Sequence, residues 1–467
     1  MVRIAGSPIA GLVAFSAATN LGVAGRAFAL PVEDPRVSAI VRGFGGRAEE
    51  DAAVGLSREG FTLLGAEAPG PGADDRIDWA RRWMPASAAA AARLDARVGG
   101  LRIGISMVLE PKTAVLALLL AEAGAEVAAF AFAAETDDAV ADALRGRGIA
   151  VHASATATPA EERAAALALL DGRPRLLVDD GAHVIRLAHR ERPDVVAGLI
   201  GATEETTSGV TPLRAMAADG ELRIPVVAAN DAVTKTWFDN RHGTGETCVL
   251  AIARALDDDL SRSRVAVVGF GPVGEGVAER LRVLGADVVV VDLDPRRALA
   301  ARFAGYATAP VLTAVRDADL VVSATGVPST IDGTVLAACR DDAVIAVAGG
   351  APEEVLPAPG TQVERLAPHV ERLRLPGGRS VRLLAGGDCV NIVAGEGNPI
   401  DVMDLSFAVQ LASIRLLLEQ RLPPGVHRLP EEQDRAVAGL AIGGGEGRAS
   451  SPAGLVDWRR TRFDLGR

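Results

Sequence analysis

The chain has 467 residues, which is enough for two or three domains with their own cores. Hydrophobic residues make up 49% of it but aromatic residues only 3%, a mixture that favours helices packed on parallel strands over a β-sandwich. The net charge of −11 arises from interspersed acids and bases, which argues against a nucleic-acid-binding surface, and no uninterrupted apolar run is long enough to span a membrane.

The Pro/Gly-rich linker APGPGADD (68–75) indicates that residues 1–75 form a small N-terminal module. The opening stretch resembles a secretory signal, but Gly, Pro, Ser and Asn interrupt its apolar run, and we do not expect cleavage. The cysteines Cys248, Cys339 and Cys389 are far apart and lack the spacing of metal ligands. They indicate reduced thiols in a cytoplasmic protein without a metal site.

Strand-like apolar runs alternate with helical stretches from residue 76 onward. The runs cover residues 101–108, 125–132, 174–180, 223–231, 264–271, 286–294, 318–326 and 342–350. Apolar runs of this length, separated by helices, are typical of parallel strands that are covered on both faces. The sequence therefore predicts an α/β protein.

A glycine-rich turn follows the run at 264–271. Its glycines form the pattern GxGxxG between a strand and a helix, and they are Gly269, Gly271 and Gly274. Such a turn lets the backbone approach a pyrophosphate at the N-terminus of the helix. The next strand ends in Asp292, whose carboxylate would bond the ribose hydroxyls and repel a 2′-phosphate, so the pattern predicts NAD. Arg296 and Arg297 follow closely and leave NADP as the alternative. Thr325 lies in the loop SATG, which would pass beneath the nicotinamide ribose.

Three polar clusters precede this turn. VDDGAH (178–183) contains Asp180 and His183, and GATEETTSGV (201–210) has the pattern of a helix N-terminus with capping hydroxyls. The third, AANDAVTKTWFDNRHG (228–243), holds Lys235 four residues before Asp239, which on a helix is either an ordinary surface pair or a functional one. Lys235 is one of only two lysines in a chain in which arginine has otherwise replaced lysine.

Together these clusters resemble the S-adenosyl-L-homocysteine hydrolase family. DDG, EETT-GV, ND-VTK--FDN--G, the glycine-rich turn and VN at 390–391 occur in the family's order and spacing, over roughly residues 77–420. The resemblance implies a Rossmann NAD-binding domain inserted in a second α/β substrate-binding domain. The expected boundaries are 1–75 for the N-terminal module, 76–250 and 381–425 for the substrate domain, 251–380 for the Rossmann domain and 426–467 for a C-terminal tail.

The resemblance also implies roles for single residues. Lys235 and Asp239 would handle the proton of a ribose 3′-hydroxyl, Glu205 would hold the ribose hydroxyls, and Asp180 would serve as acid or base near C4′ and C5′. A lysine desolvated in an apolar site would have a lowered pKa and could act as a base. The residues expected to line NAD are Thr206, Thr207, Ser208, Asn240 and Asn391.

The sequence departs from the family pattern in the substrate pocket. Val108, Gly350 and Asn398 stand where the family has histidines, and Thr244 replaces a cysteine. Glu110 replaces a threonine, and Lys112, the other lysine, replaces the glutamate or glutamine that helps to hold the adenine ring. We therefore expect a changed substrate, bound by Glu110, Lys112, Thr113, His183 and Asn398. The C-terminal Lys/Tyr segment that reaches a neighbouring subunit's cofactor in the family has no counterpart in DWRRTRFDLGR (457–467).

The favoured hypothesis is an NAD-dependent, adenosylhomocysteinase-like enzyme, a homo-oligomer acting on a small molecule. It would transiently oxidise a secondary hydroxyl of a nucleoside or sugar-like substrate, which would permit elimination, hydration or epimerisation. The alternatives are S-adenosylhomocysteine hydrolysis with substitute acids, a non-catalytic NAD-binding regulatory protein, and net dehydrogenation.

Overall fold

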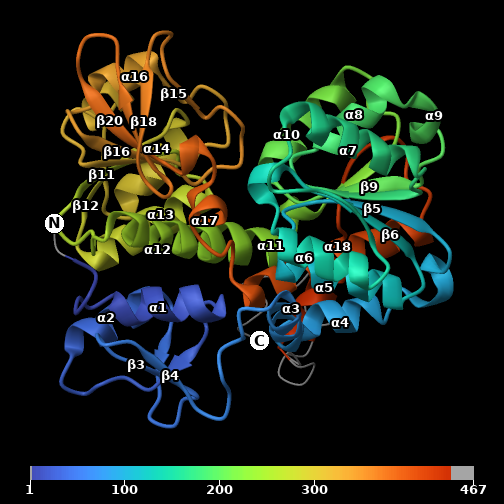
Figure 1. Ribbon diagram of the computed structural model, residues 1–467, viewed down its shortest axis with the longest axis horizontal. Coiled ribbons are helices and arrows are strands. Elements are labelled where there is room, and N and C mark those ends of the chain that lie inside the picture. The colour runs from blue at the N-terminus through green and yellow to red at the C-terminus, as the bar shows by residue number, and fades with distance from the viewer. Residues whose placement is uncertain (1–2, 443–467) are drawn as a thin grey trace, which may run out of the picture.

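Two mainly parallel sheets lie side by side in the computed structural model of the protein, which describes residues 3–442 (Figure 1). The first sheet has seven strands in the order β21-β10-β9-β8-β5-β6-β7, all parallel. In chain order they are β5 (Arg102–Ser106), β6 (Glu126–Phe130), β7 (Ala150–His152), β8 (Leu176–Asp179), β9 (Gly201–Glu204), β10 (Pro225–Ala228) and β21 (Gly425–Arg428).

Helices cover both faces of this first sheet, as its apolar strands require. They are α3 (Ala73–Arg82), α4 (Pro85–Ala91), α5 (Pro111–Glu122), α6 (Asp138–Gly146), α7 (Pro159–Asp171), α8 (His183–Glu191), α9 (Pro193–Val196), α10 (Thr207–Ala218), α18 (Ile400–Glu419) and α19 (Glu431–Ala441). Helix α5 is buried along nearly its whole length, because α3 and α4 pack over the side that does not face the sheet.

The second sheet has eight strands in the order β13-β12-β11-β14-β16-β20-β19-β18. They are β11 (Arg264–Val268), β12 (Asp287–Val291), β13 (Ala307–Thr308), β14 (Leu320–Ser323), β16 (Ala343–Val347), β18 (Gln362–Ala367), β19 (Val370–Arg374) and β20 (Ser380–Leu384). Its helices are α13 (Pro272–Leu284), α14 (Pro295–Phe303), α15 (Val311–Ala314) and α16 (Gly333–Ala338). Strand β19 is antiparallel to both neighbours, because the short turns on either side of it cannot connect parallel strands.

The chain crosses between the two sheets twice. It leaves the first sheet through α11 (Val233–Lys235), the π-helix η4 (Thr236–Thr244) and α12 (Gly245–Leu256), and it returns through α17 (Val390–Val393). Helices α12 and α17 lie against each other between the two lobes in Figure 1. The eight-stranded sheet is thus inserted in the chain of the seven-stranded one.

The residues that return to the first sheet extend beyond the expected boundary at 425. Strand β21 pairs with β10 at the edge of the sheet, and α19 packs on α18 and α4. At the other end, β20 still belongs to the second sheet, so the return begins near residue 385 and not at 381. The segment DWRRTRFDLGR lies outside the described residues.

The N-terminal module sits beneath the crossing segments in Figure 1. It contains α1 (Ala10–Thr19), β1 (Ala27–Phe28), α2 (Pro35–Gly43), β2 (Arg47–Ala48), β3 (Val54–Leu56) and β4 (Phe61–Leu63). Its apolar residues join the main core, since α1 packs on α12 and α2 packs on α13. Among residues 3–442, no helix is both long and apolar enough to cross a membrane.

Candidate active site

The active-site carboxylates stand where β8 and β9 end. Asp179 and Glu204 are paired in register and buried, and Glu204 accepts hydrogen bonds from the backbone N–H groups of Gly181 (3.0 Å) and Ala182 (2.9 Å). These two acids hold the turns beyond the strands. The residues that follow them, Asp180 and Glu205, line a cavity of about 470 Å³. Ligands of open parallel sheets bind at this edge.

Lys235 is the centre of the buried polar network in this cavity. Its ammonium lies 2.8 Å from Asp239 Oδ2, 2.8 Å from Asn240 Oδ1 and 3.5 Å from Glu205 Oε1. The π-helix η4 begins directly after Lys235, and its wide turn brings the side chains at both i+4 and i+5 toward the lysine. The surface alternative for Lys235 and Asp239 is therefore wrong, because both side chains are almost completely buried.

The charge of Lys235 differs from the sequence-based expectation. Burial by itself would lower the pKa of Lys235, but the carboxylates of Asp239 and Glu205 outweigh burial and raise this pKa above its ordinary value. The site around the lysine is acidic rather than apolar. The expectation of a lysine with a lowered pKa is therefore wrong for this arrangement, in which Lys235 is an ammonium ion.

The carboxyls around Lys235 are shifted toward neutrality. Burial raises the pKa of Glu205 to about 7 and that of Asp180 to about 6, although Lys235 opposes both shifts. Gln410 donates to Glu205 Oε2 at 2.5 Å, whereas Glu205 Oε1 accepts no hydrogen bond from a described residue. That oxygen is buried and has an unused acceptor site beside Lys235. Carboxyls with a pKa near the working pH are suited to move protons.

Helix α18 contributes residues that sequence reasoning missed. Ser406 donates to Asp239 Oδ2 at 3.1 Å, and Gln410, one turn later, reaches Glu205. Two polar residues four apart, on a helix that is otherwise largely apolar, are the signal that could have revealed them. They fix the carboxylates on either side of Lys235.

Asn398 connects the loop after α17 to the same network. It donates to Asp239 Oδ1 and, at 3.0 Å, to Thr244 Oγ1, while Asn391 Nδ2 donates to Asn398 Oδ1 at 2.7 Å. Asn398 thus orients Asp239, and its side-chain amide has no acidic proton to exchange.

Neither histidine near the motifs is charged at neutral pH. Burial lowers the pKa of His183, whose ring lines the cavity and stacks edge-on against Phe132. His242 turns away from the cavity toward Arg280, with 3.0 Å between Nδ1 and Nη2, and burial lowers its pKa to about 4. His183 therefore contributes a neutral wall to the site.

Glu110 and Lys112 form an ion pair at the N-terminus of α5. Lys112 is completely buried, and its Nζ lies 2.6 Å from Glu110 Oε2 and 3.0 Å from the carbonyl oxygen of Glu396. Glu110 keeps 18% of its side chain exposed and lines the cavity with Thr113, whereas Lys112 stands behind it. Burial raises the pKa of Glu110, and Lys112 opposes that shift.

The glycine-rich turn fits a dinucleotide. Gly269 has the left-handed φ of +96°, and a Cβ there would lie 2.8 Å from Ala324 O. A Cβ on Gly274 would lie 1.9 Å from Gly269 O, so only glycine allows α13 to start this close to β11. Gly271 lines the cavity just before the N-terminus of α13. Asp292 accepts from the backbone N–H of Phe270 at 2.7 Å, which anchors the carboxylate beside the turn.

The remaining residues expected at NAD lie in the same cavity. They are Thr206, Thr207, Ser208, Asn240, Thr325 and Asn391. Thr206 also caps α10 by accepting from Gly209 N, as the pattern at 201–210 predicts. Of the two arginines that left NADP open, Arg296 is held by Asp294 at 2.7 Å, and only Arg297 reaches the cavity.

Comparison with known proteins decides the family. A family model described as "S-adenosyl-L-homocysteine hydrolase, NAD binding domain" matches residues 240–397. An S-inosyl-L-homocysteine hydrolase of Methanopyrus kandleri is 38% identical over 82% of this chain and 93% of its own length. The chain belongs to the S-adenosyl-L-homocysteine hydrolase family.

Other members of this hydrolase family are about equally similar. The adenosylhomocysteinase of Thermotoga maritima is 38% identical over 79% of this chain and 93% of its own length. An S-inosyl-L-homocysteine hydrolase of Methanothermobacter thermautotrophicus is 40% identical over 73% of this chain and 84% of its own length. The chain is thus an enzyme of the adenosylhomocysteinase-like kind, with NAD as its cofactor.

Proposed function

We propose that the protein hydrolyses an S-nucleosyl-L-homocysteine whose base is an oxopurine such as hypoxanthine, giving the nucleoside and homocysteine. The observation that carries this proposal is the pair of Glu110 and Lys112 at the base end of the cavity. The names of two relatives, which act on S-inosyl-L-homocysteine, support it.

Hydrogen-bond polarity distinguishes the two purine bases. Adenine presents an amino donor and an N1 acceptor, whereas hypoxanthine presents an oxo acceptor and an N1–H donor. The family's glutamate or glutamine at position 112 would accept from the amino group, but the ammonium of Lys112 only donates. Ionised Glu110 only accepts, which suits the N1–H of an oxopurine and opposes the N1 lone pair of adenine.

Lys112 acts on the base through Glu110 in our proposal. Two of its three ammonium hydrogens are engaged by Glu110 Oε2 and the carbonyl of Glu396. Lys112 is completely buried and lines neither cavity, so it favours the ionised form of Glu110 and fixes that carboxylate as the acceptor for the N1–H of an oxopurine.

The proposed chemistry at the ribose uses the network around Lys235. When bound, NAD supplies a reversible hydride acceptor at the 3′-carbon. Glu205 Oε1 accepts the proton of the 3′-hydroxyl, and the Lys235 ammonium donates to the 3′-oxygen and stabilises the negative charge that develops there. Asp239 holds Lys235 in place for this contact.

Asp180 is proposed to move the other protons. It lines the cavity near Glu205, and its pKa of about 6 lets it accept the acidified C4′ proton as a carboxylate and return it later. The electron pair left at C4′ expels the sulfur from C5′, and Asp180 passes the proton it has taken to that sulfur, so that homocysteine leaves as a thiol and a C4′–C5′ double bond remains. Water adds across this double bond with its hydroxyl at C5′, while Asp180 takes a proton from the water and returns it to C4′. Re-reduction of the 3′-ketone then completes the conversion of one thioether and one water to one alcohol and one thiol.

The test is a comparison of two substrates that differ only in the base. We expect kcat/KM for S-inosyl-L-homocysteine to exceed that for S-adenosyl-L-homocysteine by about tenfold or more, the effect of one mispaired hydrogen-bonding edge. The double variant Glu110→Thr/Lys112→Gln, which restores the family pattern, should shift this ratio toward the adenosyl compound. A wild-type preference for S-adenosyl-L-homocysteine would overturn the assignment of the base.

A further inference from the structure

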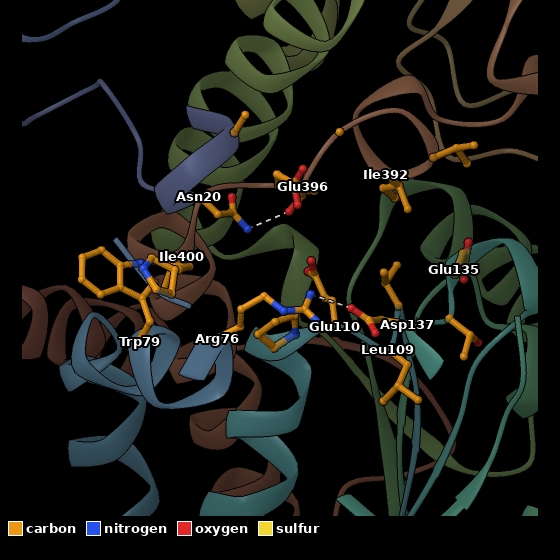
Figure 2. Close-up of a pocket in the computed structure, with 18 of the residues that line it drawn as sticks. Asn20, Arg76, Trp79, Leu109, Glu110, Glu135, Asp137, Ile392, Glu396 and Ile400 are labelled. Atoms are coloured by element: carbon orange, nitrogen blue, oxygen red, sulfur yellow. Dashed lines mark hydrogen bonds and ion pairs between the residues drawn. The ribbon is translucent and has the colours of Figure 1, made fainter. Parts of the chain in front are cut away.

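The N-terminal module forms part of a second cavity beside the base end of the active site. This cavity measures about 380 Å³, and the last residues of α1, including Thr19 and Asn20, form one of its walls. Figure 2 shows Asn20 and Trp79 on the left, Arg76 and Glu110 near the middle, and Glu135 on the right. The two cavities adjoin, because they share lining residues, among them Val108, Glu110, Glu135, Ile392 and Gly397.

Asn20 holds both ends of the loop segment 396–400. Its Nδ2 donates to the carbonyl of Glu396 at 2.7 Å, drawn as a dashed line in Figure 2, and its own carbonyl accepts from Ile400 N at 2.8 Å. Asn20 caps α1 with a left-handed φ of 48°, which directs the side chain out of the helix and toward this loop. Gly22 N and Arg26 Nη2 continue the contact by donating to Asp401 at 2.9 and 2.8 Å.

The carbonyl of Glu396 links Asn20 to the ion pair of Glu110 and Lys112. The same oxygen accepts from Asn20 Nδ2 and from Lys112 Nζ, which uses both of its lone pairs. The position of this carbonyl therefore sets the position of the buried ammonium, and through it the carboxylate of Glu110. The segment also carries Asn398, which bonds Asp239 at the ribose end.

We infer that the N-terminal module is part of the base-recognition apparatus, and that Asn20 is its positioning residue, acting through the Glu396 carbonyl on Lys112. This inference rests on the proposed role of Glu110 and Lys112 toward the base. It gives the N-terminal module a task in specificity, because the module lines the adjoining cavity and fixes the buried ammonium that holds Glu110.

The test removes the donor and keeps the backbone. Asn20→Gly retains a residue that adopts the left-handed conformation and removes the side chain that carries Nδ2, and Arg47→Ala, which breaks an exposed ion pair with Glu49 on the same module, is the matched control. We expect Asn20→Gly to raise KM for S-inosyl-L-homocysteine about tenfold, the worth of one hydrogen bond near a charged group, with kcat changed less than about twofold. Arg47→Ala should leave both constants unchanged.

The base selectivity separates positioning from a merely structural role. Asn20→Gly should lower the S-inosyl to S-adenosyl ratio of kcat/KM, and it should have no further effect on that ratio in a Lys112→Gln background. An equal loss with both substrates, or an equal effect with and without Lys112, would overturn the inference. The proposed function has its own test, since a wild-type preference for the adenosyl compound would overturn it. The effect of Asn20→Gly on the ratio of the two kcat/KM values can be measured whichever substrate the wild-type enzyme prefers.

Discussion

Removing the buried cation at position 112 tests how much the ion pair of Glu110 and Lys112 contributes to the stability of the protein. In Lys112→Met, the Glu110 carboxylate loses its partner at 2.6 Å and the charge that opposes the burial-driven rise of its pKa. Breaking a buried pair from one side costs about 3–5 kcal/mol. Because Glu110 keeps 18% of its side chain exposed, we expect the low end, about 3 kcal/mol at pH 8.

The cost in Lys112→Met should depend on pH. The folded-state pKa of Glu110 is already above its ordinary value and rises further without Lys112. When a carboxyl has a higher pKa in the folded than in the unfolded protein, it does not lower the stability of the protein below the unfolded-state pKa. As the pH rises from the unfolded-state pKa to the folded-state pKa, the folded protein loses stability. The cost of Lys112→Met should therefore be smaller at pH 5 than at pH 8, because protonation of Glu110 in the folded state removes the unpaired buried charge.

The assay is urea-induced unfolding of wild type, Lys112→Met and the double variant Glu110→Gln/Lys112→Met at pH 5 and pH 8. The double variant should recover most of the loss at pH 8, because it buries no unpaired charge. The reasoning is refuted if Lys112→Met costs the same at both pH values, or if the double variant is as unstable as the single one.

Three further predictions concern the ribose and cofactor ends. Lys235→Arg should lower kcat at least about 100-fold while bound NAD is retained, measured by steady-state kinetics and released cofactor, because a guanidinium does not reproduce the ammonium's contacts with Asp239 and Glu205. Asp292→Ser should raise the NADP to NAD affinity ratio about tenfold in cofactor titrations, since the repelling carboxylate is gone. As the pH falls from about 7 to about 6, kcat/KM should fall about tenfold, because Glu205 must be ionised to accept a proton, and the fall should steepen below about pH 6, because Asp180 must be ionised as well. A flat profile between pH 5 and 7 would exclude Glu205 as the base.

Local patterns in the sequence predicted the cofactor end of the site. The glycines around Gly271 and the carboxylate of Asp292 belong to one strand–helix–strand unit, β11–α13–β12, so their spacing in the sequence predicts that they lie together. The link between Lys235 and Asp239 was also visible, because helical spacing places them together. Each of these predictions needs only neighbouring residues.

The contacts of Glu110 and Lys112 could not be predicted from sequence spacing. Lys112 and Glu110 are two residues apart at the start of a helix, where sequence spacing does not predict that the side chains meet, and their common partner Glu396 comes from a distant segment. The raised pKa of Lys235 depends on Glu205, which another strand supplies. Such contacts follow from the packing of separate elements.

The central claim is that a substrate 3′-hydroxyl is transiently oxidised in the network around Lys235, and the absorbance of reduced nicotinamide tests it most directly. We predict that mixing the NAD-loaded enzyme with inosine raises this absorbance, that 3′-deoxyinosine leaves it unchanged, and that Lys235→Arg abolishes the rise. Hydrolysis of S-inosyl-L-homocysteine without any rise, or an equal rise with 3′-deoxyinosine, would contradict the account.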